Sequence, residues 1–268
     1  MGGCRPRRKG VVVNQQPDRR IAIVTGGTGG IGRAICEALA ADGLRVAVVD
    51  RSIERASAVA AGLGGEGHVG YAADVSDEVS VTSLFRQVRT ASGPVSVLVT
   101  AAGILLLRPD GSRKPIAETP LEDWEHTQAV NSRGVFLCCR EYVREVPDAA
   151  THPRIVTISS VAAQLGGFRS SAAYIASKAA VLGFTKALAR ELAEKQVSVN
   201  SVAPGIIDAP MLRLSLDPAN DDPVAASIPL GRIGQPEDVA QAVRFLVSPG
   251  AGYLTGTVID VNGGYRMQ

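Results

Sequence analysis

The sequence predicts an α/β protein in which helices cover both faces of a doubly wound parallel sheet. Short apolar runs rich in β-branched residues alternate with longer segments of helical periodicity. The runs end at small or acidic residues, as expected where the carboxyl ends of parallel strands line a ligand crevice. A glycine-rich turn follows the first run. Together these observations predict a single domain of three layers, with helices on either side of the sheet.

The length and composition fit one large domain. The chain has 268 residues, of which 46% are hydrophobic and 20% are charged, so it can bury a large core. Its net charge of +2 gives no reason to expect binding to nucleic acid or to a membrane surface. No apolar run has the length of a membrane span. We therefore expect neither a nucleic-acid nor a membrane partner.

The cysteines indicate a reducing compartment and no metal site. Cys4, Cys36, Cys138 and Cys139 lack the spacing of metal ligands, and the last two are adjacent in a predicted helix. Buried free thiols are typical of a cytoplasmic protein. We therefore expect the cytoplasm as the location.

Residues 1–18 are predicted to form a basic, disordered extension. Arg5, Arg7, Arg8 and Lys9 contribute most of the local positive charge. A short arm that contacts nucleic acid is the alternative. The folded domain is expected to occupy residues 19–268.

The first strand and the turn after it have the pattern of a dinucleotide-binding site. Residues 21–24 form a continuous apolar run, and a helix is predicted over residues 33–42. Glycines between them permit positive φ and a close approach of a pyrophosphate, which the free N–H groups of the helix N-terminus would bind. Glycine clusters also mark ordinary turns, but here the required strand and helix are both present. The expected cofactor contacts are Gly26, Thr28, Gly30, Ile31 and Gly32.

The second strand, residues 45–49, ends at Asp50. This is near where a dinucleotide fold places the acid that binds the adenosine ribose. The alternative role is a helix N-cap, but Ser52 can cap the following helix itself. We therefore expect Asp50, with Arg51 beside it, to contact the cofactor.

The remaining elements continue the alternation. Strands are predicted over residues 68–73, 95–99, 154–158, 197–202 and 258–261, and helices over residues 77–92, 121–145, 172–195 and 236–247. The strand ends place Asp74, Val75, Ala101, Ala102, Gly103, Ser159, Ser160, Pro204 and Gly205 at one edge of the sheet. Residues 208–228 are predicted to be a flexible substrate loop.

Tyr174 and Lys178 are four residues apart on a predicted helix, so the phenol and the ammonium would lie side by side. A nearby cation favours the phenolate and lowers the tyrosine pKa, as a general acid/base requires. Taken alone, the pair equally fits an exposed helix face.

The order of these motifs resembles the short-chain dehydrogenase/reductase family from about Arg20 to Gly264. The matching features are the TGxxxGIG turn, Asp50, Asp74-Val75, Asn131, the Ser160, Tyr174 and Lys178 set, Pro204-Gly205 and the C-terminal Val261-Asn262-Gly263-Gly264. The resemblance implies a Rossmann-type sheet, a nicotinamide cofactor and proton transfer by a tyrosine. It also suggests a homo-oligomer, a tetramer, in which the apolar faces of the helices at 121–145 and 172–195 would be buried.

The resemblance also implies roles for single residues. Tyr174 would be the acid/base, Lys178 would lower its pKa and hold the nicotinamide ribose, and Ser160 would donate to the substrate oxygen. Asn131 would kink its helix and anchor a water in a proton relay. Further cofactor contacts are implied at Asp74, Val75, Ala101, Ala102, Gly103, Pro204, Gly205 and Ile207.

Two positions depart from the family pattern. Thr100-Ala101-Ala102-Gly103 replaces the usual Asn-Asn-Ala-Gly, and Ala209 replaces a threonine that meets the carboxamide. The backbone of Ile207 could still bind that group. Neither departure affects the proton-transfer set.

The cofactor is expected to be NAD. Relatives that prefer NADP often carry a basic residue where this chain has Gly29, and they lack an acid at the position of Asp50. Arg51 is the contrary feature, since it could contact a 2′-phosphate.

The substrate is expected to be a secondary alcohol or ketone in an apolar pocket built by residues 104–116, 161–171 and 208–228. Arg169 and Arg213 could meet an anionic group or lie exposed on the surface. Two other functions stay open: an NADPH-dependent 3-oxoacyl thioester reductase, and a dinucleotide-binding scaffold or sensor without turnover.

Overall fold

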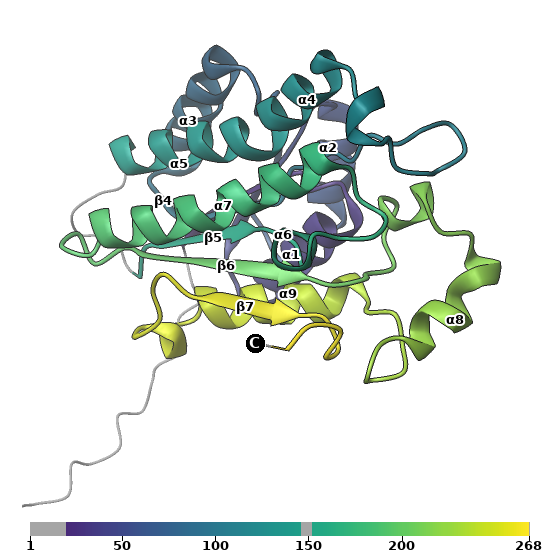
Figure 1. Cartoon of the computed structure of the whole chain (residues 1–268). Helices are drawn as coiled ribbons and strands as arrows, with labels where there is room; N and C mark the ends of the chain where they lie inside the picture. Colours follow the sequence, from purple (N-terminus) through teal and green to yellow (C-terminus); the bar gives the residue numbers. More distant parts are fainter. Residues whose placement is uncertain (1–19, 146–151, 268) are drawn as a thin grey trace, which may run out of the picture.

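The computed structural model describes residues 20–145 and 152–267. The predicted basic extension and Cys4 lie outside these residues. The chain forms a seven-stranded sheet in the order β3-β2-β1-β4-β5-β6-β7, and every pairing is parallel (Figure 1). The strands are β1 (Ile21–Thr25), β2 (Arg45–Asp50), β3 (Val69–Ala72), β4 (Val95–Thr100), β5 (Arg154–Ile158), β6 (Ser198–Pro204) and β7 (Val258–Val261).

Helices cover both faces of the sheet, which confirms the predicted doubly wound architecture. The α-helices are α1 (Gly30–Ala41), α2 (Ile53–Gly62), α3 (Glu78–Ser92), α4 (Leu121–Gln128), α5 (Gly134–Glu145), α6 (Ala162–Leu165), α7 (Ala172–Glu191), α8 (Asp221–Ala226) and α9 (Pro236–Val247). Short 3₁₀ turns are η1 (Ile116–Glu118), η3 (Leu212–Leu214), η4 (Pro218–Asn220) and η5 (Pro249–Ala251).

Two apolar clusters hold the layers together. Ile21 and Ile23 of β1 join residues of α3, α5 and α7 on one face, whereas Ala22 and Val24 join α1, α2 and α9 on the other. This follows from the strand geometry, because successive side chains point to opposite faces. The central strands β1 and β4 are buried along their whole length.

Side-chain caps fix where several helices begin. Ser52 accepts a hydrogen bond from Arg55 N and caps α2, as predicted from the sequence. Asp77 caps α3. Ser171 accepts from Tyr174 N at 3.3 Å and caps α7, so the cap sits three residues before the tyrosine. The start of α7, and with it the position of Tyr174, is therefore set locally.

The helix predicted over residues 121–145 is interrupted. A π-helical turn, η2 (Ala129–Arg133), separates α4 from α5 and contains Asn131. Such turns insert an extra residue and are common at functional sites. The predicted helix over 172–195 also ends earlier, at Glu191, because Leu192 ends the helical pattern and Gln196 adopts a positive φ of 56°.

Residues 208–228, predicted to be a flexible loop, contain η3, η4 and α8. Figure 1 shows α8 projecting beyond the carboxyl ends of β6 and β7. Arg213 joins two parts of this segment, since its guanidinium forms ion pairs with both Asp208 and Asp221. The hydrogen bonds that Arg213 donates to Asp221 and Asp208 raise its pKa.

In the part of the chain that the structure describes, no helix is long and apolar enough to cross a membrane. Nor do the described residues contain a cluster of side chains suited to hold a metal ion. Cys36, Cys138 and Cys139 are free, buried thiols. Burial raises the pKa of Cys36 and of Cys138 to about 12, so these two thiols are protonated at neutral pH.

Candidate active site

The glycine turn between β1 and α1 packs directly against the end of β4. Gly26 has a φ of 65°, and a Cβ on it would lie 2.7 Å from Ala102 Cα. A Cβ on Gly32 would lie 2.1 Å from the Gly26 carbonyl oxygen. No side chain fits at either position, so glycine is required for the turn to close. The closed turn leaves backbone N–H groups at the start of α1, where a pyrophosphate would bind.

A cavity of about 160 Å³ lies beside this turn at the carboxyl ends of β1 to β4. It brings together residues that the sequence placed far apart: Gly26, Asp50, Arg51, Asp74, Val75, Ala102 and Gly103. The strand order changes direction here, because β2 and β4 flank β1 on opposite sides. Such a switch point is where open parallel sheets bind ligands.

The Asp50 carboxylate is held by two hydrogen bonds. One oxygen accepts from the Thr28 hydroxyl, and the other accepts from Ser52 N at 3.3 Å. Thr28 was expected to contact the cofactor, and the structure gives it a contact with Asp50 that the sequence pattern did not indicate. The glycine turn thus orients the acid at the end of β2.

Asp74 is a second fixed carboxylate at this cavity. Its Oδ1 accepts from Ser76 N at 2.8 Å and from the Ser76 hydroxyl at 2.6 Å. Burial acts to raise the Asp74 pKa, but these hydrogen bonds and the nearby Arg51 and His126 outweigh it, and the pKa is lowered. Asp74 therefore offers a charged acceptor at neutral pH.

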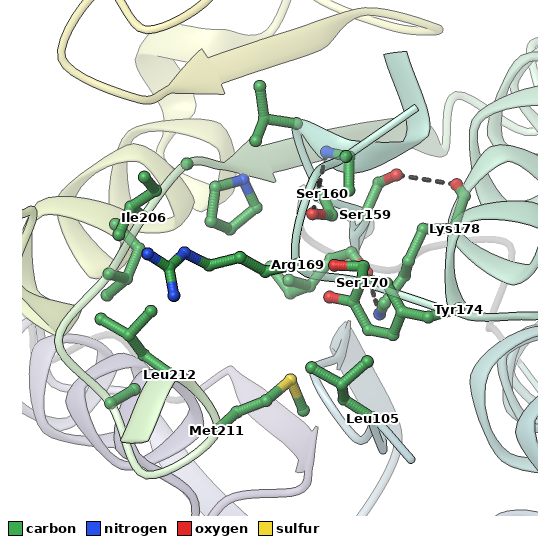
Figure 2. A pocket seen from close by; sticks show the side chains of 18 of the residues that line it. Leu105, Ser159, Ser160, Arg169, Ser170, Tyr174, Lys178, Ile206, Met211 and Leu212 are labelled. Atoms are coloured by element: carbon green, nitrogen blue, oxygen red, sulfur yellow. Dashed lines mark hydrogen bonds between the residues drawn. The ribbon is translucent and has the colours of Figure 1, made fainter. Parts of the chain in front are cut away.

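A second cavity, of about 220 Å³, contains Tyr174, Lys178 and Ser160 (Figure 2). Other residues that were predicted to contact the cofactor line the same cavity: Ile31, Ala101, Pro204, Gly205 and Ile207. Ala101 lines this cavity and its neighbour Ala102 lines the first one, so the end of β4 joins the two. An extended ligand could reach from Asp50 to Tyr174 across this strand end.

Tyr174 and Lys178 lie together, as their spacing predicts. The Lys178 ammonium is 5.9 Å from the centre of the Tyr174 ring and donates to Ile158 O at 2.9 Å. Tyr174 is 8% exposed and Lys178 is 4% exposed. The alternative of an exposed helix face is therefore wrong for this pair.

The two serines after β5 have different environments. Ser159 donates to the Lys178 carbonyl oxygen at 2.8 Å and so anchors α7 to the sheet. Ser160 accepts from Ala162 N at 3.1 Å, and its hydroxyl acts on the Tyr174 phenol and lowers the phenol's pKa. Both serines line the cavity, but of the two only Ser160 affects the pKa of Tyr174. This arrangement favours Ser160 as the partner of Tyr174.

The protonation of the pair differs from the sequence-based expectation. Burial raises the pKa of Tyr174, and the Ser160 hydroxyl opposes the rise only in part. Burial also lowers the pKa of Lys178, to about 8. The expected lowering of the tyrosine pKa is not observed, because loss of hydration disfavours the charged phenolate and outweighs the effect of Ser160. The phenol is protonated at neutral pH in this state.

Asn131 supports the site from the π-helical turn. Its side-chain oxygen accepts from Ile104 N at 2.8 Å, and its amide nitrogen donates to Ile104 O at 2.9 Å and to the Ser177 hydroxyl at 3.1 Å. Asn131 thereby connects the chain after β4 to α7. A Cβ on Gly103 would lie 3.5 Å from this oxygen and 3.4 Å from the Lys178 ammonium, so the loop passes close to both.

Near the end of β6, the chain is shaped by contacts that the motifs alone did not indicate. A Cβ on Gly205 would lie 2.6 Å from Asn262 Cβ, so this glycine allows the C-terminal motif to pack against it. Ile207 forms a parallel bridge with Gly234 in which Ile206 O and Asp208 N make the hydrogen bonds. The N–H and C=O groups of Ile207 itself then point to the other side.

Some cavity residues were not predicted to be functional. Ile206 and Tyr265 line the cavity but lie outside the predicted pocket segments, whereas Leu105 and Ser170 lie within them. No motif marks Ile206 or Tyr265, since they meet the other residues only when the loops after β6 and β7 converge on the cavity.

Comparisons with known proteins agree with this geometry. The family model described as enoyl-(acyl carrier protein) reductase matches residues 26–266. D-threitol dehydrogenase of Mycolicibacterium smegmatis is 36% identical over 94% of each chain. The 3-oxoacyl-(acyl-carrier-protein) reductase of Escherichia coli is 38% identical over 92% of this chain and 98% of that protein. A solved Brucella melitensis structure, described as a short-chain dehydrogenase/reductase of the glucose/ribitol dehydrogenase kind, is 37% identical, with a TM-score of 0.85 over 93% of this chain and 97% of that one.

Proposed function

The chain belongs to the short-chain dehydrogenase/reductase family of oxidoreductases, and on that basis we propose that it interconverts a secondary alcohol and a ketone with NAD(H). The observation that carries the proposal is the meeting of Ser160, Tyr174 and Lys178 in a cavity that adjoins the dinucleotide turn at β4. The turn fits such a cofactor because Gly26 and Gly32 leave no room for side chains. A bound nicotinamide ring supplies or takes up the hydride.

We propose that Tyr174 moves the proton. Its raised pKa keeps the phenol protonated at neutral pH, which is the form that donates a proton to a ketone oxygen during reduction. Ser160 lies in the same cavity, acts on the pKa of the phenol and would share the substrate oxygen with it. Lys178 is buried beside the ring, and its ammonium would stabilise the phenolate that remains after donation.

The proposed preference for NAD rests on Asp50. Its carboxylate would accept hydrogen bonds from the ribose hydroxyls and repel a 2′-phosphate. Thr28 and Ser52 hold it in place, which supports a fixed role in recognition. Gly29 at the position before the second motif glycine agrees with this preference. Arg51 lines the same cavity and is the contrary feature, since its cationic group would favour NADP.

We also propose a homotetramer in the cytoplasm. The free, buried thiols support a reducing compartment. The helices α5 and α7 support assembly, because Phe136 is 43% exposed and α7 carries exposed alanines beside it.

A second candidate function is an NADPH-dependent 3-oxoacyl thioester reductase. It is favoured by the Escherichia coli relative and by (3R)-3-hydroxyacyl-CoA dehydrogenase of Homo sapiens, which is 37% identical over 92% of this chain. Asp50 argues against it. A non-catalytic scaffold or sensor is the third candidate, and the buried Asn131, Ser160, Tyr174 and Lys178 set argues against that one.

The test combines a substrate panel with one variant. Secondary alcohols and ketones are assayed with NAD(H) and NADP(H) by nicotinamide absorbance, and Tyr174→Phe is compared on the best substrate. Removing only the hydroxyl should leave cofactor binding intact and reduce kcat by about 100- to 10,000-fold. A variant that keeps more than about a tenth of the wild-type kcat would show that Tyr174 is not the acid/base.

A further inference from the structure

The Tyr174 cavity has apolar walls and is free of acidic side chains. Among the described residues that line it, the only cationic side chains are Lys178 and Arg169, and none is an Asp or a Glu. Lys178 is buried beside Tyr174 and donates to Ile158 O. Arg169 is therefore the one charged group of the cavity wall, within the described chain, that the proposed proton transfer does not use.

Arg213 provides a useful contrast. It comes from the segment of residues 208–228, which Arg169 contacts through Ser215, but its guanidinium is paired with Asp208 and Asp221. It does not line the cavity. Of the two arginines that the sequence offered for an anionic group, only Arg169 lines the cavity, and it is an exposed residue, whereas Arg213 is half-buried and paired.

Arg169 keeps one edge of its guanidinium without a protein acceptor. Its Nη1 donates to Ser215 O at 3.0 Å, and within residues 20–145 and 152–267 no acceptor lies on Nε or Nη2. The Nε and Nη2 donors form one fork, whose geometry matches the two oxygens of a carboxylate. Figure 2 shows the side chain extended along the cavity, with its guanidinium on the side of Ile206 and Leu212, away from Tyr174.

From this arrangement we propose that Arg169 binds a carboxylate on the substrate, so that the substrate is a hydroxy acid or the corresponding oxo acid. The inference rests on the proposed function, since it assigns a carboxylate-binding role to the end of the cavity opposite Tyr174. The hydroxyl or ketone carbon would lie at Tyr174, and the carboxylate at Arg169. Between them the substrate would have an apolar body, because Leu105, Met211 and Leu212 line that stretch.

Two alternative roles of Arg169 lead to different outcomes. As a latch between the loop after β5 and the segment after β6, through Ser215, Arg169 would affect all substrates alike. As a site for the phosphates of a carrier thioester, it would favour coenzyme A thioesters over small neutral thioesters. Only a carboxylate site predicts discrimination between an acid and its own ester.

The experiment compares wild type, Arg169→Gln and a control, Arg190→Gln, which lies on the exposed side of α7. Oxo acids of graded chain length are assayed with NADH and NADPH against their methyl esters. Matched 3-oxoacyl thioesters of coenzyme A and of neutral N-acetylcysteamine form a further pair. In wild type the acid of best length should have the higher kcat/KM. Arg169→Gln should reduce kcat/KM for the acid about 10- to 100-fold, through KM, and should leave the ester unchanged.

A binding measurement keeps the proposal testable without turnover. Calorimetry with unreactive straight-chain carboxylates should show tighter binding to wild type than that of their amides, and Arg169→Gln should remove the difference. The proposal is overturned if wild type has equal kcat/KM for an acid and its ester and also binds the carboxylate and its amide with equal affinity. It is likewise overturned if Arg169 favours only coenzyme A thioesters over neutral thioesters. If wild type reduces neutral ketones in either of those cases, the proposed function still holds and only the carboxylate site is refuted. Absence of turnover with every compound and both cofactors would refute the proposed function instead.

Discussion

At the scale of single residues, burial decides the charge of the groups in the cavity. Tyr174 and Lys178 are both withdrawn from water, and in each case burial disfavours the charged form. The phenol therefore keeps its proton, whereas the ammonium loses its proton more readily than an exposed lysine would. Their placement one helical turn apart follows from the sequence, but the state of their protons depends on what covers them.

The lysine gives a prediction about stability and pH. The pKa of Lys178 is about 8 in the fold, compared with 10.5 for an unperturbed lysine. Between these two pH values the unfolded chain binds more protons than the folded chain. Burying Lys178 therefore destabilises the fold fully below about pH 8, and this destabilisation disappears as the pH rises toward 10.5. Lys178→Met removes this dependence. The ionisation of Lys178 lowers the free energy of unfolding of wild type by about 3 kcal/mol at about pH 7, and by close to zero above about pH 10. Because the variant lacks this penalty, its free energy of unfolding relative to wild type should be higher by that amount at about pH 7 and should lose the advantage as the pH rises.

Urea unfolding of both proteins from about pH 7 to about pH 10.5 measures this difference. Lys186→Met is the matched control, because Lys186 is exposed on the same helix. A difference between wild type and Lys178→Met that does not change with pH would contradict the assignment.

The acid at the end of β2 gives a prediction about cofactor choice. Wild type should use NAD(H) better than NADP(H), and Asp50→Ser should narrow that preference sharply through KM, because the repulsion of a 2′-phosphate is lost. Thr28→Val keeps the charge but removes the hydrogen bond that orients it, so its effect should be intermediate.

The ratio of kcat/KM values for the two cofactors is the measurement. Ser52→Ala serves as control, since it removes the cap of α2 but keeps the backbone N–H that binds Asp50. If wild type prefers NADP(H), or if the ratio is the same in Asp50→Ser, Asp50 does not select the cofactor.

At the scale of elements, the interruption of the helix before α5 is the feature with the clearest consequence. The π-helical turn carries Asn131, which makes three hydrogen bonds to Ile104 and Ser177. A buried asparagine in a regular helix would have to find partners within reach of that helix. Here the turn allows one side chain to join the loop after β4 to the helix of Tyr174 and Lys178.

Asn131→Ala should therefore cost both stability and activity. It leaves the Ile104 N–H and C=O without the partners that Asn131 provides, and such losses at a buried site cost roughly 2 to 4 kcal/mol in total. The value of kcat should fall as well, because Gly103 and Lys178 lie against this side chain. Urea unfolding and steady-state kinetics test the two effects.

Ser132→Ala is the control for the same turn. Its hydroxyl donates to Gln128 O within the helix, so the variant should change stability little and leave kcat unchanged. Equal behaviour of the two variants would mean that Asn131 has no special part in holding the site.

At the scale of the whole molecule, the convergence of strand ends creates the site and the outer helices offer surfaces for assembly. The exposed side of α7 carries Ala179, Ala180, Gly183 and Ala187. A Cβ on Gly183 would have no neighbour within 4 Å among the described residues, so this surface is open in the single chain. Small residues permit a close approach of a second helix, in agreement with the proposed tetramer.

Sedimentation equilibrium should show a tetramer at micromolar concentration, and Gly183→Arg should dissociate it. The same substitution should fold normally, because no described residue occupies the space. Ala61→Arg on the exposed side of α2 is the control and should leave the assembly unchanged. A monomeric wild type would rule the tetramer out.

The order and type of the strands and long helices could be predicted from the sequence, whereas the short helices α6 and α8 lie in predicted loops. The strand over residues 258–261 and the helix over residues 236–247 agree with β7 and α9, because periodicity and capping are local properties. The spacing of Tyr174 and Lys178, the glycine turn and the ends of the strands are local too. They were therefore sufficient to predict the parallel sheet and part of the lining of both cavities.

What those residues meet depends on the tertiary fold. Thr28 donates to Asp50, Ser160 rather than Ser159 lowers the pKa of the Tyr174 phenol, and Arg169 but not Arg213 lines the cavity. The pKa of Tyr174 nevertheless rises instead of falling, because burial by the surrounding chain disfavours the charged phenolate. Contacts between distant parts of the chain and the loss of hydration leave no periodic trace in a sequence, and they exist only once the loops at the carboxyl ends of the strands have closed over the site.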